Sequence, residues 1–204
     1  PYDTPKEFGN PFKNDPTEEW VTEELIKNQR SSFGPHSARE VPGYNDDLGD
    51  KYTMGVGSIN NVADAKEQID AYDTGINYAD FYLNKVFEDL KKLNIWDDTA
   101  IIISADHGEN QGELNVWGDH QTADHITNRV PLIIRWPGIT DNNKGNTVDN
   151  KFYNLDLTST ISQIVSSSQP ERWDGINFTE NLKNSHSENG REFLVISHGA
   201  WSCQ

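Results

Sequence analysis

Two short apolar runs separated by a polar segment constrain the fold of this chain more than any other feature. Residues 100–103 (AIII) and 130–134 (VPLII) enclose a segment rich in Asp, Glu and His. The first run is mostly β-branched and does not alternate, which predicts a strand covered on both faces, as in a parallel sheet flanked by helices. Ligands gather beyond the carboxyl ends of such strands, where Asp106, His107 and Gly108 follow. The sequence therefore predicts an α/β fold with a polar site at this strand end.

Composition limits the partners of this chain. Its 204 residues include 17 basic and 33 acidic side chains, for a net charge of -16, and 34% of the residues are hydrophobic. This balance argues against nucleic acid or an anionic membrane surface as a partner. An anionic substrate would need a locally positive pocket, which a bound cation would supply. The single cysteine, Cys203, permits no intrachain disulfide.

The sequence predicts three helices and one further strand. Apolar residues recur at helical spacing between about residues 59 and 94, as expected of a helix packed on a sheet. Asp15 and Pro16, followed by acidic residues, indicate the start of an earlier helix. The expected elements are helices at 16–30, 59–94 and 154–165 and a short strand at 193–196.

A longer match extends over the central segment. Residues 72–109 (YDTGINYADFYLNKVFEDLKKLNIWDDTAIIISADHGE) and 129–138 (RVPLIIRWPG) resemble the C-terminal part of the catalytic domain of sulfatases, a branch of the alkaline phosphatase superfamily. The resemblance implies an alkaline phosphatase-like α/β fold with a mostly parallel sheet, present here as a partial domain. We expect residues 1–165 to belong to that catalytic domain and residues 166–204 to begin a smaller, truncated C-terminal portion.

The resemblance also implies an activity for a longer parent protein. Sulfatases hydrolyse sulfate esters with a formylglycine nucleophile made from Cys or Ser, and we expect that residue in an N-terminal half that this fragment lacks. The fragment alone is therefore expected to be inactive, and the parent's substrate to be a sulfated small molecule or carbohydrate. Two alternatives stay open: a phosphodiesterase or phosphonate hydrolase of the same superfamily, and a non-catalytic acidic module that binds a cation or a glycan.

Asp106 and His107 are the predicted metal ligands. A carboxylate and an imidazole side by side can bind a divalent cation. Ca²⁺ prefers oxygen ligands, whereas an imidazole shifts the preference toward Mn²⁺ or Zn²⁺. Sulfatases nonetheless combine Asp with His or Asn in a calcium site, so the resemblance favours Ca²⁺.

His120 is the predicted catalytic residue. Sulfatases commonly carry a Lys nine residues before the Arg that corresponds to Arg129, where it binds the sulfate and the leaving oxygen. In this sequence that position is His120, a departure that puts the lysine role in doubt. An imidazolium can still stabilise or protonate a leaving alkoxide. The alternative is a histidine that only orders the loop.

Further polar residues around His120 have open interpretations. A second metal site could involve Asp119, Asp124 and His125, although the five-residue gap between the histidines suits neither one helix face nor alternating strand positions. Glu109 and Glu113 are interpreted as solvated acids or as the rim of a pocket.

Two more residues outside this segment need an interpretation. His36 either bonds to local backbone or contacts substrate. Ser168 lies in a Ser-x-Pro-x-Arg sequence that matches the sulfatase nucleophile signature, but it follows the metal strand instead of preceding it. We therefore do not assign Ser168 as the nucleophile.

Overall fold

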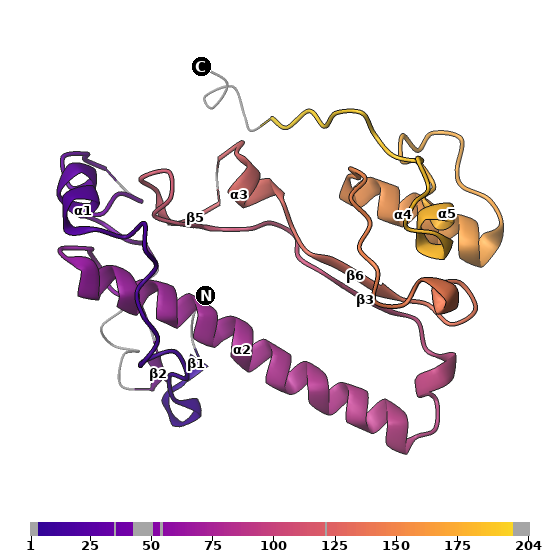
Figure 1. Ribbon diagram of the computed structural model, residues 1–204, viewed down its shortest axis with the longest axis horizontal. Helices are drawn as coiled ribbons and strands as arrows, with labels where there is room; N and C mark the ends of the chain where they lie inside the picture. The colour runs from indigo at the N-terminus through magenta and orange to yellow at the C-terminus, as the bar shows by residue number, and fades with distance from the viewer. Residues whose placement is uncertain (1–3, 35, 43–50, 54, 121, 198–204) are drawn as a thin grey trace. The chain divides into compact units, whose positions relative to one another are not determined.

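A computed structural model describes residues 4–34, 36–42, 51–53, 55–120 and 122–197, and the chain divides into two compact units (Figure 1). The first unit combines Pro1–Leu93 with His107–Arg129. The second combines Asn94–Asp106 with Val130–Gln204. The expected domain boundary at residue 165 remains a prediction.

Two helices form the framework of the first unit. Helix α1 spans Glu23–Gln29 and begins where the Thr22 hydroxyl accepts the Leu25 N–H at 3.1 Å. Helix α2 spans Val62–Lys92, and its first turn is capped by the Asn61 side chain, which accepts the Asp64 N–H at 3.0 Å. Oxygen-bearing side chains at these positions satisfy amide groups that have no partner within the helix.

Short strands and turns complete the first unit. Strand β1 (Thr4–Pro5) pairs antiparallel with β2 (Tyr52–Thr53), and β4 (Asn110–Gln111) pairs antiparallel with β5 (Trp117–Asp119). The remaining elements are the 3₁₀ turn η1 (Lys6–Phe8) and the one-turn helix α3 (His125–Asn128).

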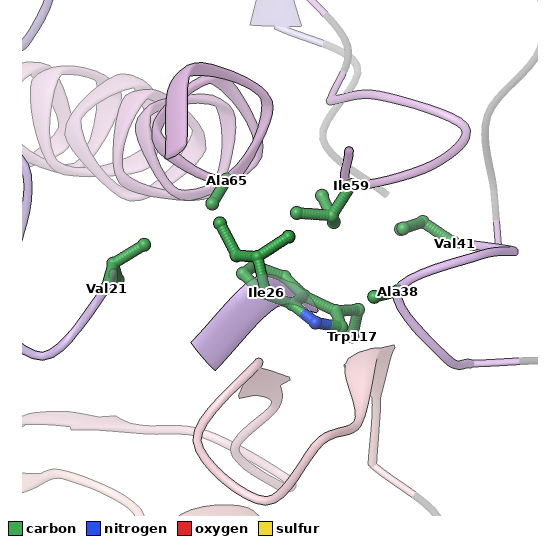
Figure 2. Close-up of a cluster of buried hydrophobic side chains, with 7 residues drawn as sticks. All are labelled: Val21, Ile26, Ala38, Val41, Ile59, Ala65 and Trp117. Atoms are coloured by element: carbon green, nitrogen blue, oxygen red, sulfur yellow. The ribbon is translucent and has the colours of Figure 1, made fainter. Parts of the chain in front are cut away.

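The core of the first unit forms around Trp117, which is fully buried (Figure 2). Aliphatic side chains from α1, from α2 and from the segments before α2 surround the indole; they are Val21, Ile26, Ala38, Val41, Ile59 and Ala65. The buried Gln29 amide connects α1 to the β4–β5 hairpin. Its oxygen accepts the Trp117 indole N–H at 2.9 Å, and its nitrogen donates to the Gly112 carbonyl at 2.7 Å.

Gly112 shows why the hairpin can close around this indole. Its φ is +109°, and a Cβ atom built on it would lie 2.4 Å from the Trp117 ring. Both the backbone conformation and the space therefore require glycine.

The second unit contains an antiparallel strand pair and two helices. Strand β3 (Ile101–Ser104) pairs with β6 (Leu132–Arg135), with Ile102 opposite Ile134. The other elements are the 3₁₀ turns η3 (Trp96–Asp98) and η4 (Asp141–Asn143) and the helices α4 (Asn154–Ser166) and α5 (Thr179–Lys183).

Asp156 organises the helical part of the second unit from a fully buried position. Its carboxylate accepts Nε of Arg191 at 2.9 Å and Nη2 at 2.6 Å. It also accepts the backbone N–H groups of Tyr153 and Ile176 at 2.7 and 2.8 Å. Burial would raise the pKa of Asp156, but these hydrogen bonds and the Arg191 charge outweigh burial and lower it.

The structure corrects the sequence-based account of the strands. Every strand pair among the described residues is antiparallel, so the expected parallel arrangement is not found within them. The β3 and β6 side chains are half-buried or exposed instead of covered on both faces. The expected strand at 193–196 is an extended segment without strand pairing, joined to α4 through hydrogen bonds between Val195 and the Tyr153 hydroxyl.

The expected helices agree with the structure more closely than the expected strands do. The expected helices at 59–94 and 154–165 are confirmed as α2 and α4. The helix expected from residue 16 begins only at residue 23, because residues 16–18 are irregular, residues 18–21 form a turn and Thr22 provides the cap. Within the described ranges, no helix combines the length and the apolar character that crossing a membrane requires.

We expect Gln29→Leu to lower the free energy of unfolding by about 2–3 kcal/mol, because it leaves the buried indole N–H and the Gly112 carbonyl unpaired. Urea unfolding of the 204-residue chain, followed by Trp fluorescence, measures this loss. Asn28→Leu, the same type of change at an exposed position of α1, should alter stability by less than about 0.5 kcal/mol. Equal losses in both variants would contradict the role of Gln29.

Candidate functional site

The polar segment between the two apolar runs is folded and does not form an open loop. The β4–β5 hairpin and α3 lie within it, and Trp117 belongs to the core. Sequence reasoning missed this because most of the residues are polar. A turn signal was present in the sequence, because Gly112 and Asn115 are residue types that favour turns. In the structure both take positive φ between the two strands.

The segment is closed at its base by a backbone contact. The Gly108 N–H donates to the Thr127 carbonyl at 2.6 Å. A Cβ atom at residue 108 would lie 2.1 Å from the Ile126 carbonyl oxygen, so only glycine fits here. This contact brings the residues that follow β3 against α3.

Asp124 is a helix cap. Its Oδ1 accepts the N–H groups of Ile126 and Thr127 at 2.8 and 2.9 Å, while Oδ2 accepts from the Thr127 hydroxyl and the Asn110 amide. Burial would raise the pKa of Asp124, but these bonds and one with Thr122 lower it to about 2. Its oxygens are therefore engaged in ordering α3, which argues against the second metal site considered from the sequence.

Asn110 is the hub of this network and was not singled out from the sequence. Its fully buried side-chain amide donates to the hydroxyls of Thr122 and Thr127 at 3.1 and 3.0 Å, besides Asp124 at 3.3 Å. No spacing pattern in the sequence identifies such a residue, because its importance depends on three partners that come together only in the folded chain.

His107 and His120 lie in face-to-face contact. Their ring centroids are 3.8 Å apart with an interplanar angle of 20°. His107 Nδ1 lies 2.8 Å from the Gly108 carbonyl, which can only accept, so Nδ1 carries a proton. His120 is 43% exposed, and its Nδ1 lies 3.8 Å from Oε1 of Glu109, which is 19% exposed. The structure therefore groups His120, the predicted catalytic residue, with His107, a predicted metal ligand.

The other predicted ligand, Asp106, directly precedes His107 in the chain and is exposed. Both residues follow the end of β3, as expected from the sequence. Among the residues that the structure describes, no group of three or more His, Cys, Asp or Glu side chains is arranged to hold a metal ion. The roles of Asp106, His107 and His120 therefore remain predictions.

Three other residues singled out from the sequence, Asp119, His36 and Glu113, make polar contacts within the first unit. Asp119 Oδ1 accepts the backbone N–H of His120 at 2.8 Å, and Oδ2 lies 3.5 Å from His36 Nδ1. His125 is an exposed residue in the first turn of α3. Glu113 accepts the Gln111 N–H at 2.8 Å within the hairpin. Cys203 lies outside the described residues.

The described residues mix helices and short strands, with Asp106 and His107 directly after β3, an arrangement compatible with part of an α/β domain. The sulfatase family model matches residues 3–167, and the chain belongs to the sulfatase family. The family generally uses a metal ion and a formylglycine.

Individual relatives agree with this family assignment. The chain is 28% identical over 136 residues to an ulvan-active sulfatase of Formosa agariphila. This match covers 66% of the chain and 26% of the relative. It is 31% identical over 101 residues to a choline-sulfatase of Rhizobium meliloti, covering 50% of this chain and 19% of the relative. The chain thus spans about a quarter or less of these two relatives.

A solved structure confirms the fold class. A phosphonate monoester hydrolase from Silicibacter pomeroyi matches with a TM-score of 0.60 and 25% identity, over 77% of this chain and 33% of that one. The likeness confirms the alkaline phosphatase-like α/β class expected from the sequence. It also shows that the present chain corresponds to only part of such a domain.

Asp124 should make the stability of the 204-residue chain depend on pH in the acid range. A pKa of about 2, below the ordinary 3.8, means that the ionised carboxylate stabilises the fold above about pH 4, a contribution lost as pH falls toward about 2. Asp124→Asn keeps a capping oxygen. Between about pH 4 and pH 2, the free energy of urea unfolding should therefore fall by up to about 2 kcal/mol less in this variant than in the wild-type chain.

Asp124→Ala serves as the matched variant, because it removes the cap as well as the charge. It should cost about 0.5–2 kcal/mol at neutral pH. If the free energy of unfolding falls equally steeply with decreasing pH in the wild-type chain and in Asp124→Asn, this role for Asp124 is contradicted.

Proposed function

We propose that a sulfatase domain containing this chain hydrolyses a sulfate ester, and that His120 assists the departure of the alcohol. The observation that carries the proposal is the contact between His120 and His107, whose rings are stacked at 3.8 Å. In a chain that belongs to the sulfatase family, this contact puts the proposed proton donor beside a proposed ligand of the metal. A sulfate bound to that metal would then lie close to His120.

Asp106 and His107 fit the role of metal ligands. The proton on His107 Nδ1, held by the Gly108 carbonyl at 2.8 Å, leaves the lone pair on Nε2, the tautomer in which an imidazole binds a metal through that atom. Asp106 contributes carboxylate oxygens from the adjacent position. We propose Ca²⁺ as the ion, with Mn²⁺ or Zn²⁺ as the alternatives, and expect other parts of a sulfatase domain to complete the ligand set.

The proposed chemistry divides between groups on this chain and groups outside it. A cation and a formylglycine, when present, supply a counter-charge for the sulfate oxygens and a nucleophile for the sulfur. As the bond between sulfur and the ester oxygen breaks, its electron pair goes to that oxygen, and His120 donates a proton there from Nε2. The sulfur would at the same time form a bond to the nucleophile outside this chain, so the step yields the free alcohol, a neutral imidazole on His120 and a sulfuryl group transferred to that nucleophile.

We propose a sulfated small molecule or carbohydrate as the substrate class. The names of the two relatives, an ulvan-active sulfatase and a choline-sulfatase, support one possibility each. Phosphonate or phosphodiester hydrolysis is the second candidate activity, because the phosphonate monoester hydrolase shares the fold. Bound Ca²⁺ would favour the first activity, and bound Mn²⁺ or Zn²⁺ would favour the second.

A domain containing this chain should hydrolyse 4-nitrophenyl sulfate faster than phenyl phosphonate at equal concentration, with release of sulfate measured directly. The isolated 204-residue chain should show no turnover of the same sulfate ester, because no nucleophile is assigned within it. Turnover by the isolated chain, or a preference of the domain for the phosphonate, would overturn this proposal.

His120→Ala should be most damaging for substrates with poor leaving groups. For an alkyl sulfate, kcat should fall by about 10²–10³, the usual contribution of general acid catalysis. The loss for 4-nitrophenyl sulfate should stay below about tenfold, because nitrophenolate leaves without a proton. His125→Ala, a change at an exposed histidine five residues away, is the control and should leave both rates unchanged. Equal losses of His120→Ala on both substrates would argue against proton donation.

A further inference from the structure

We infer that Glu109 is a positioning residue that orients the His120 imidazole; this inference rests on the proposed role of His120. Glu109 Oε1 lies 3.8 Å from His120 Nδ1, within ion-pair distance but beyond that of a direct hydrogen bond. Hydrogen bonds at catalytic sites are often long before substrate binds and shorten in the complex. Because Glu109 faces Nδ1, the opposite nitrogen, Nε2, is the one that can reach the leaving oxygen.

The hairpin explains why these two side chains meet. Asn110 of β4 is paired with Asp119 of β5, so the next residues outward, Glu109 and His120, lie across from each other at the open end of the hairpin. Asn110 is fully buried and holds β4 through its three hydrogen bonds. The strand pairing of their neighbours therefore brings the backbones of Glu109 and His120 close together.

Other contacts restrict the His120 ring to a few orientations. His107 covers one face of the ring, and Asp119 Oδ1 accepts the His120 backbone N–H at 2.8 Å. These two contacts fix the main chain and one ring face, but neither distinguishes Nδ1 from Nε2. The Glu109 carboxylate makes that distinction, since it attracts the nitrogen that carries hydrogen.

The other acids of the hairpin are directed elsewhere. Glu113 accepts a backbone N–H from Gln111, and Asp119 Oδ2 lies near His36 Nδ1. The negative charge of Glu109 also acts on Tyr72 of α2, whose pKa is raised first by burial and then by that charge. Of the two interpretations of Glu109 from the sequence, a solvated acid or the rim of a pocket, its low exposure of 19% beside His120 favours the second.

The tautomer of His120 in the 204-residue chain tests the inference without any activity. In long-range ¹⁵N–¹H spectra of neutral imidazoles, the wild-type His120 should carry its hydrogen mainly on Nδ1. Glu109→Ala should shift it toward Nε2, and Glu109→Gln should give a smaller shift at nearly constant side-chain size. Glu113→Ala, which removes the same charge from the same hairpin, should leave His120 unchanged. Backbone amide spectra report whether each variant keeps the fold.

Kinetics of a sulfatase domain containing this chain give the second measurement. Glu109→Ala should lower kcat for an alkyl sulfate by about tenfold, with KM and the rate for 4-nitrophenyl sulfate nearly unchanged. The double variant Glu109→Ala/His120→Ala should be no slower than His120→Ala alone, because the two residues act as one unit.

The outcomes separate this inference from the proposed function. A leaving-group effect is a larger loss of kcat for the alkyl sulfate than for 4-nitrophenyl sulfate. The role of Glu109 alone would be overturned if His120→Ala shows this effect and Glu109→Ala does not. Additive losses in the double variant, or an unchanged His120 tautomer, would overturn it as well. Absence of the leaving-group effect in His120→Ala would overturn the proposed role of His120, and the role of Glu109 with it.

Discussion

The hydrogen bond from the Gly108 N–H to the Thr127 carbonyl is the contact on which the candidate site depends. It joins the two ends of a segment that would otherwise be a long polar loop, and only glycine allows the approach. With its ends fixed, the segment can place Asn110 among Thr122, Asp124 and Thr127, and the network then orders both the hairpin and α3. The histidine pair lies at the edge of this ordered structure.

The electrostatics of the site contrast with those of the whole chain. At a net charge of -16, the chain as a whole repels anions, so binding of the proposed sulfate ester would have to rely on short-range contacts. Among the acids near the histidines, Asp124 caps α3 and Asp119 accepts the His120 N–H, whereas Glu109 faces His120 Nδ1 at 3.8 Å and Asp106 is exposed beside His107 in the chain. Two of these carboxylates are therefore engaged in hydrogen bonds to the backbone, and the other two lie next to the histidine pair.

Sequence reasoning succeeded where the signal is local and failed where it depends on packing. The existence and approximate extent of α2 and α4 were predicted from local sequence, by hydrophobic periodicity for α2, and the position of Asp106 and His107 follows from the end of β3. The roles of Asn110 and Gln29 could not be predicted, because an amide becomes structural only when its distant partners are known. The antiparallel pairing of β3 and β6 was also hidden, since apolar runs do not encode strand direction.

The Asp156–Arg191 pair has a consequence for how this polypeptide can be divided. The family match ends at residue 167, yet the guanidinium that neutralises the buried Asp156 carboxylate comes from residue 191 and donates two hydrogen bonds, and the Ile176 amide adds a third. A boundary drawn at the end of the match would separate a buried anion from its counter-ion, a loss that costs several kcal/mol. The smallest piece that keeps α4 electrically balanced therefore extends through Arg191, well beyond the limit that sequence similarity sets.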